Sequence, residues 1–475
     1  MKYLTNYSIL ALLSALLFAG CTKDFTELNT NPNAPVDVQP ELLLRQVIFD
    51  YADGMSYEGF TGGSNLGQYF SADPGFNAFD RGNLLAPQFG GNPWPLLYTN
   101  LRDIQLVLDK SRSDASLAVY EGPALVLKSL IAANITDIFG DVPYTEAAQG
   151  ANGIVNPSYD LQEDIYTGAD GILANLKLAV EVMDAYTGAA QLNGDELYSG
   201  DLDAWIRFAN SLSMRYLVRA SGPYNSASIE FFNIVSVDGR FITEASEDAV
   251  YQFNSAPNDF RMARARSGDF TNYLMSSTID TTLDAFNDPR QELWFRANAN
   301  GAYSGERNGL AEGSLVSNPT VPGLVWRENS TALKANFMTS WETHFVLAEA
   351  ASIGLIFDDP KTLYETGITQ AFAYWDTELP ADYLTRPGVE YDDLSQVATQ
   401  RWLASIGNGY EGWIEWRRTG FPEFLAPVSS LNGGLIPVRF PYPTTEQALN
   451  EAAFNAAVQR IGGENSPNVK TWWAL

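Results

Sequence analysis

The chain has 475 residues, 45% of them hydrophobic, which is enough to bury a large core as one domain or as a few ordinary ones. It carries 57 acidic against 29 basic residues, a formal net charge of -28. This balance excludes nucleic acid, which needs a basic face, and argues against polyanionic ligands. A neutral ligand is the easier partner, although acidity also keeps a protein soluble.

The first 21 residues predict an export signal that ends at the only cysteine of the chain. Lys2 gives a positive start, an apolar run extends from Ile9 to Phe18, and small residues stand directly before Cys21. The run is shorter than the roughly 20 apolar residues that span a bilayer, but it fits a cleaved secretory signal. We therefore expect a signal peptide over 1–20 and lipidation of Cys21, as in bacterial lipoproteins. The acyl chains would anchor the protein to a membrane, and a lone cysteine forms no internal disulfide.

Residues 21–40 are polar, which is typical of a lipidated tether with turns. The rest, 41–475, is expected to be a single domain, because no later change in composition marks a second one. No later segment is a continuous apolar run of spanning length. Apolar residues recur three and four positions apart, which predicts amphipathic helices. In chain order these helices cover 41–57, 95–111, 115–139, 161–185, 203–220, 226–236, 338–354, 360–376, 392–406 and the segment around 449–456.

Several of the predicted helices follow one another as pairs, such as 115–139 with 161–185 and 338–354 with 360–376. Paired helices of this length are typical of solenoids, in which neighbours bury each other's apolar stripes. Two long regions, Thr61–Pro95 and Phe253–Asn336, break the helical pattern with many Gly, Asn and Pro residues. Long irregular segments of this kind are usually functional loops or linkers, and these contain too many aromatic residues for linkers.

Catalytic motifs are almost absent. The single histidine, His344, lies inside a predicted helix and cannot build a two-histidine metal site. We interpret it as structural, bonded to a neighbour such as Glu342 or a backbone carbonyl. No phosphate loop, dinucleotide fingerprint, EF-hand or nucleophile elbow occurs. A carboxylate pair for glycoside hydrolysis stays open among 57 acidic residues, but we expect no enzyme. No cofactor is expected, whereas so many carboxylates leave a bound calcium ion open.

Aromatic residues, 13% of the chain, are the better functional lead. Flat rings can stack on the apolar faces of sugars while Asp, Asn and Arg bond the hydroxyl groups, and loops on a rigid scaffold usually carry function. Most loop aromatics are nevertheless expected to fill the core. The candidate ligand-binding residues in the two irregular regions are Asp73, Phe76, Phe79, Arg81, Tyr303, Arg307 and Trp326.

Several motifs, spread over nearly the whole chain, together resemble a known family. They are Phe25–Asn33, Trp94–Asn100, Thr136–Ala147, Leu197–Arg215, Glu342–Ala350, Trp413–Pro422 and Ile436–Pro443. In this order they are similar to the SusD/RagB family of nutrient-binding outer-membrane lipoproteins of Bacteroidetes, in particular its second SusD-like subfamily. The most specific match is Thr136–Ala147, in which Gly140 and Pro143 are suited to end a helix. We take these motifs as scaffold and transfer none of them as ligand residues.

The resemblance implies an all-α fold of four tetratricopeptide-like helix pairs, an α-α superhelix, with irregular loops on one side. It also implies a lipoprotein at the exterior of the outer membrane that caps a SusC-type TonB-dependent transporter, captures an oligosaccharide and delivers it. Some members carry peptides, so a peptide-binding lid is the main alternative; a structural plug and an enzyme are two others. Only Lys23-Asp24 resembles the acidic surface-export signal of these bacteria, so exposure outside the cell rests on the resemblance.

Overall fold

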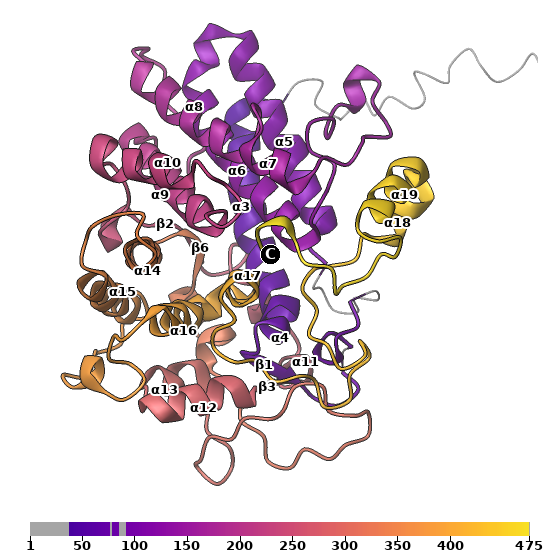
Figure 1. Cartoon of the computed structure of the whole chain (residues 1–475), viewed down its shortest axis with the longest axis vertical. Helices are drawn as coiled ribbons and strands as arrows, with labels where there is room; N and C mark the ends of the chain where they lie inside the picture. The colour runs from indigo at the N-terminus through magenta and orange to yellow at the C-terminus, as the bar shows by residue number, and fades with distance from the viewer. Residues whose placement is uncertain (1–37, 77, 85–91, 475) are drawn as a thin grey trace, which may run out of the picture.

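Helices that pack one after another along the chain make up most of this computed structural model, which describes residues 38–76, 78–84 and 92–474 (Figure 1). Each of the main helices contacts the next, from α3 through α5, α6, α8 and α9 to α14, and α14 contacts α15 and α16. The predicted all-α fold of helix pairs is therefore confirmed. The bounds are α3 (Pro40–Glu58), α5 (Trp94–Ser113), α6 (Glu121–Phe139), α8 (Ile172–Ala185), α9 (Leu202–Arg219), α10 (Ala227–Asn233), α14 (Ser340–Ser352), α15 (Pro360–Tyr374), α16 (Leu394–Ala404) and α17 (Gly409–Thr419).

Helices α3, α5, α9, α14, α15 and α16 begin and end within two residues of their predicted bounds, whereas the helix predicted over 115–139 begins as α6 only at Glu121, after a 3-10 helix over Ala115–Tyr120. Helix α15 shows why: Pro360 stands in its first turn, and the Asp359 carboxylate accepts a hydrogen bond from the Thr362 amide at 3.1 Å. The predicted helix 161–185 is wrong in one respect, because it is two helices, α7 (Gln162–Thr167) and α8. They separate at Gly168, where a Cβ atom would lie 2.5 Å from the Asp164 carbonyl oxygen.

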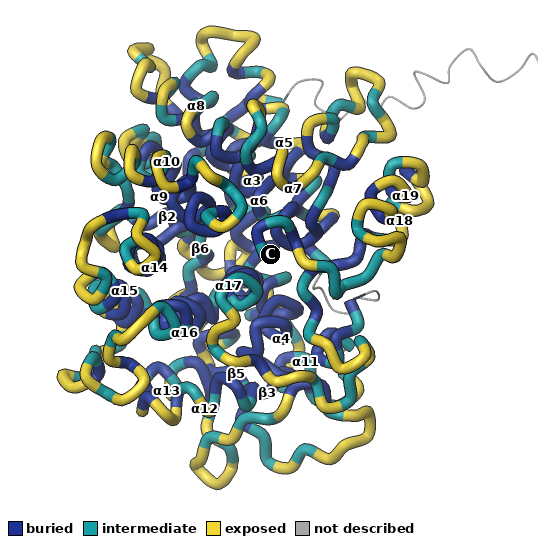
Figure 2. Tube along the Cα trace, viewed as in Figure 1, coloured by how far each residue is buried: buried dark blue, intermediate teal, exposed yellow. Residues whose placement is uncertain are grey.

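Helix α6 lies at the centre of the molecule and packs against α5, α8 and α9. Among the described residues, Ala115–Phe139 is long and apolar enough to cross a membrane by length and composition, but 67% of its apolar 18-residue window is buried inside the protein. Figure 2 shows this burial as dark blue around the α6 label. The helix ends as predicted at Gly140. The φ of this residue is +84°, a value that glycine adopts readily because it has no side chain. We therefore assign α6 to the core.

The two irregular regions come together at the lower end of the molecule in Figure 1. Strand β1 (Phe70–Ala72) pairs antiparallel with β3 (Tyr273–Met275), with Phe70 opposite Met275. Two further antiparallel pairs are β2 (Ala249–Gln252) with β6 (Lys334–Met338), and β4 (Phe295–Arg296) with β5 (Val321–Pro322). Short helices complete this part and the C-terminal segment: α4 (Ser64–Leu66), α11 (Ser267–Phe270), α12 (Ser277–Phe286), α13 (Arg290–Trp294), α18 (Thr444–Leu449) and α19 (Glu451–Arg460).

Aromatic side chains from both irregular regions fill the space between them, as expected for most loop aromatics. The Phe60 ring, which follows the C-terminal end of α3, is the centre of this cluster. It lies within 6.1 Å, between ring centroids, of Phe70, Phe260, Phe270, Tyr273 and Trp326. Such edge and offset contacts add to the burial of the rings. These rings belong to the same hydrophobic core as the helices, so they hold the irregular segments to the helical body.

A buried ion network joins α6, α9, α14, α16 and α17. Its members are Asp137 of α6, Arg215 and Arg219 of α9, Glu342 and Glu349 of α14, Arg401 of α16, and Glu411, Glu415 and Arg418 of α17. The pKa of Glu415 lies below its usual range, because three arginines outweigh the effect of burial, whereas burial raises the pKa of Glu411. Charged side chains that are buried away from water need partners of opposite charge. The network therefore fixes how the five helices pack against one another.

Candidate ligand-binding site

One pocket opens where the end of α3 meets the irregular regions. We call it the Tyr57 pocket; its volume is about 260 Å³. Its lining consists of Tyr57 from the last turn of α3, Thr61 from the turn Gly59–Gly63 that follows α3, Phe76 from the first irregular region, and Arg261, Met262, Arg264, Ala265, Asp269 and Tyr273 from the second. Ligand pockets typically have roughly 300–1,000 Å³. The pocket is therefore sized for a single small unit of a ligand whose remainder lies outside.

Aromatic rings form the apolar part of the pocket. The Tyr273 ring is buried and holds Phe76 edge-on, with 5.3 Å between the ring centroids. Tyr57 and Phe76 are half-buried, so each ring has both core and open surface. The Thr61 hydroxyl donates to the Tyr57 carbonyl at 2.9 Å, which keeps the turn after Tyr57 helical. Rings held in this way present a fixed surface to a flat apolar face.

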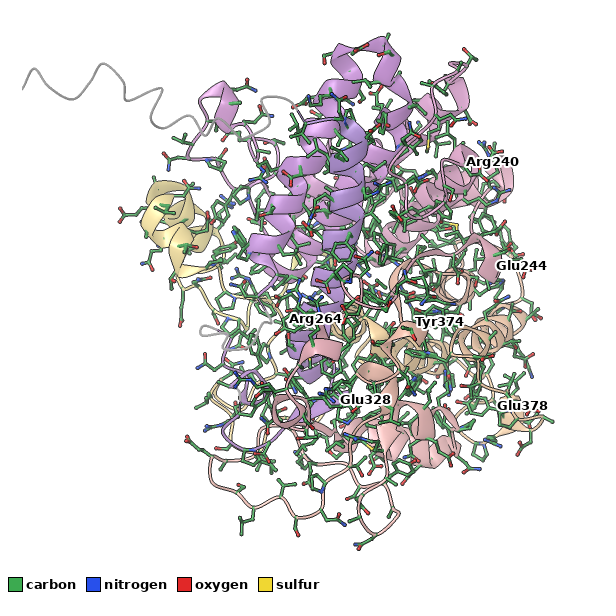
Figure 3. All side chains as sticks on the ribbon, turned by 180° about the vertical axis from the view of Figure 1, so that it is seen from behind. Arg240, Glu244, Arg264, Glu328, Tyr374 and Glu378 are labelled. Atoms are coloured by element: carbon green, nitrogen blue, oxygen red, sulfur yellow. The ribbon has the colours of Figure 1, made fainter. Side chains whose placement is uncertain are left out.

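Charged groups form the polar part, and each guanidinium of the pocket is engaged by a carboxylate. Arg261 donates from Nε and Nη2 to Asp53 Oδ2 at 3.0 and 2.5 Å, and its guanidinium lies 4.8 Å from the Tyr57 ring centre. Arg264 Nε lies 3.2 Å from Asp259 Oδ1, and Arg264 occupies the middle of the face in Figure 3. Burial raises the pKa of Tyr57, so its hydroxyl is neutral at physiological pH and can donate a hydrogen bond.

Of the residues selected from the sequence, Phe76 alone lines the pocket. Asp73 lies nearby and is half-buried; its carbonyl accepts from the Phe76 amide at 2.9 Å. Phe79 and Trp326 are in the core, 4% and 3% exposed, so neither ring is open to a ligand in this structure. The Phe79 ring packs on Phe440, and Trp326 Nε1 donates to the Trp294 carbonyl.

The other three selected residues lie away from the pocket. Arg81 donates from Nε to the Ser429 carbonyl at 2.8 Å, and Arg307 from Nη2 to the Ala426 carbonyl at 3.0 Å. Both therefore fasten the same C-terminal loop. Tyr303 is half-buried and is not part of the pocket lining.

Sequence patterns do not predict most of the pocket. Tyr57 is the last residue of the helix predicted over 41–57, and nothing in that pattern gives its ring a functional role. The signal that could have led to the other residues is the run Arg261, Arg264 and Arg266, three cations within six residues of a strongly acidic chain.

A second pocket, of about 270 Å³, lies at the end of α12 but is less suited to a sugar. Arg386 spans it and donates from Nη1 to the carbonyls of Phe286 and Asn287 at 3.0 and 2.9 Å. No aromatic ring lines this pocket. Because Arg386 already donates to the carbonyl groups at the end of α12, it is not available to a ligand. The pocket therefore has neither an aromatic ring for stacking nor an available positive charge.

Two chemical expectations concern metals and His344. Within the described ranges no group of three His, Cys, Asp or Glu side chains could hold a metal ion. The His344 Nδ1 atom lies 2.9 Å from the Ser340 carbonyl oxygen, and burial lowers the pKa of the ring. The prediction that this histidine is satisfied by a backbone carbonyl is confirmed.

Comparison with known proteins places the chain in a family. The model of the second SusD-like family, described as starch-binding and associating with the outer membrane, matches residues 32–443. The chain belongs to this SusD-like family. No curated protein sequence matches it significantly. The family association confirms the resemblance found in the sequence.

Solved structures show the same SusD-like fold at low sequence identity. A chitin-binding protein has a TM-score of 0.80 and 21% identity over 92% of this chain and 100% of its own. A SusD homologue from Bacteroides fragilis has a TM-score of 0.79 and 23% identity over 92% and 99%. A chitin-binding SusD homologue from Flavobacterium johnsoniae has a TM-score of 0.79 and 21% identity over 92% and 98%.

Proposed function

We propose that this SusD-like protein is a non-catalytic glycan-binding lipoprotein, which binds one sugar unit of an oligosaccharide in the Tyr57 pocket. The observation that carries the proposal is the pocket itself, where Tyr57 and Phe76 offer ring surface beside Arg261, Arg264 and Asp269. Sugars need both an apolar face and donors and acceptors for their hydroxyl groups. The family description as starch-binding and the chitin-binding relatives support a glycan as the ligand.

The location and partner in this proposal follow from the family and from the start of the sequence. The family associates with the outer membrane, and Cys21, which lies outside the described residues, is the proposed site of lipidation. An anchored protein that binds sugar at modest affinity is suited to deliver it. We propose a SusC-type TonB-dependent transporter as the recipient of the sugar. The face of the protein that binds the sugar would be exposed to the cell exterior.

Isothermal titration tests the glycan proposal. Wild-type protein is titrated with neutral malto- and chito-oligosaccharides and, in parallel, with mixed peptides. We expect saturable binding of at least one neutral glycan, and a roughly ten-fold weaker affinity for Tyr57→Ala, because an aromatic contact contributes about 1–1.5 kcal/mol. Phe357→Ala is the matched control, since Phe357 is 96% exposed on the loop between α14 and α15.

Two outcomes would contradict the proposal. If peptides bind and no glycan does, the protein is a peptide carrier instead. Equal loss of affinity in Tyr57→Ala and Phe357→Ala would place the glycan elsewhere on the protein. Recovery of the bound oligosaccharide without new reducing ends is expected for a binding protein, and steady release of reducing ends would show an enzyme.

A further inference from the structure

The charge of the Tyr57 pocket limits which glycans it can accept. Its two cations are both neutralised from behind: Asp53 and Asp259, the partners of Arg261 and Arg264, have side chains only 8% and 11% exposed. An anionic ligand that took Arg261 would draw it from Asp53 and leave that buried carboxylate without its cation, which is costly. The guanidiniums can therefore donate hydrogen bonds to hydroxyl groups but are poorly suited to bind a carboxylate or sulfate.

The remaining charge at the pocket is negative. Asp269 lines it, is half-buried and forms no ion pair with any residue that the structure describes. Burial is the main cause of the raised pKa of Tyr57, and the Asp269 carboxylate adds to it, so Asp269 acts electrostatically on this ring. The basic Arg266 belongs to the same segment but does not line the pocket.

The half-buried Asp269 shares the pocket with the Tyr57 and Phe76 rings. Rings with a carboxylate next to them are suited to an ammonium group, because its positive charge is attracted both by the face of a ring and by the carboxylate. A neutral sugar can use the same rings, but it gains no ionic attraction from Asp269.

We propose that the pocket prefers a glycan with free amino groups, such as a glucosamine oligomer, in which an ammonium contacts Asp269 and the Tyr57 and Phe76 rings, and that it rejects uronate and sulfated glycans. This inference rests on the proposed function, since it assumes that the Tyr57 pocket binds sugar. It goes further, because it names the charge class of the sugar and the residue that selects it.

The test compares tetrasaccharides of glucosamine, N-acetylglucosamine and galacturonate, together with maltotetraose, by titration at low ionic strength and at a pH where the glucosamine amine is protonated. We expect glucosamine to bind about three- to five-fold tighter than N-acetylglucosamine, as for a partly exposed ion pair, and galacturonate to bind weakest. Asp269→Asn should abolish the preference, so that glucosamine and N-acetylglucosamine oligomers bind with equal affinity. Asp358→Asn, at an exposed position after α14, is the matched control. Added salt should reduce the preference in the wild type.

The outcomes separate this inference from the function on which it rests. If none of the four oligosaccharides binds, the glycan function fails and the inference fails with it. If a neutral glycan binds and weakens with Tyr57→Ala, but glucosamine shows no advantage, the glycan function stands and the amino-sugar inference is overturned. Tight binding of galacturonate, or a glucosamine preference that survives Asp269→Asn, would also overturn the inference alone.

Discussion

The buried ion network should make the protein sensitive to the loss of a single charge at Glu342. The Glu342 carboxylate accepts from Arg215 Nε at 2.6 Å, from Arg215 Nη2 at 2.5 Å and from Arg401 Nη2 at 3.2 Å. All three side chains are at most 4% exposed. Glu342→Gln keeps the shape but leaves two buried guanidiniums short of a charge, and removing one partner of a buried pair costs about 3–5 kcal/mol. We expect the lower half of this range, because the amide oxygen still accepts a hydrogen bond.

Urea denaturation followed by tryptophan fluorescence measures this loss as a lower midpoint with an unchanged slope. Glu196→Gln is the matched control, since the Arg45–Glu196 pair also has a short contact, 2.8 Å, but side chains 57% and 42% exposed. An exposed pair of this kind contributes about 0.2–1 kcal/mol. Replacing Arg215 by Met together with Glu342 by Leu should cost less than Glu342→Gln alone. A Glu342→Gln variant as stable as Glu196→Gln would refute the reasoning, because burial would then have no effect on the pair.

Two further predictions concern a buried acid and the anchor. Asp80 accepts from the Ala72 and Gly309 amides and from Asn308 Nδ2, and burial raises its pKa to about 6. The folded state then binds the proton more tightly than the unfolded chain, so this group's stabilisation is complete below about pH 4 and is lost as the pH rises through about 6. The unfolding free energy of wild type relative to Asp80→Asn should therefore rise by about 2.4 kcal/mol from pH 7 to 4, measured by urea denaturation; a constant difference would contradict the shift. Cys21→Ala should move the protein from the membrane to the soluble fraction, and a variant that stays with the membrane would show another anchor.

The sequence predicted the helices well because their signals are local. Helices α3 and α15 have an apolar stripe and a proline in the first turn, and neither signal depends on distant residues. The second irregular region was harder. Strand β3 exists because Phe70–Ala72, about two hundred residues earlier, pairs with it, and no local pattern contains that partner. Helix α12, which follows β3, was missed although the Ser276 hydroxyl accepts from the Thr278 amide and caps it.

The candidate site shows the same limit at the level of single side chains. Phe76, Phe79 and Trp326 have the same sequence character, aromatic residues in segments rich in Gly, Asn or Pro. Only the tertiary structure separates them, since Phe79 turns to Phe440 and Trp326 to the Trp294 carbonyl, while Phe76 remains half-buried at the pocket. Tyr57 is the opposite case, a pocket residue that the sequence does not indicate. Its place in a helical pattern does not show that its ring lines a pocket.

The position of the pocket explains how one scaffold can serve different ligands. One wall consists of Tyr57, in the last turn of α3, and Thr61, in the turn directly after it, and the helical body fixes α3 through its packing against α5. The opposite wall, Arg261 to Asp269, belongs to an irregular segment that the Phe60 cluster and a few ion pairs hold in place. Substitutions in that second wall can change the charge of the pocket without disturbing the buried ion network. The Tyr57 ring on α3 would then contribute binding affinity, and the residues of the irregular segment would determine which sugar binds.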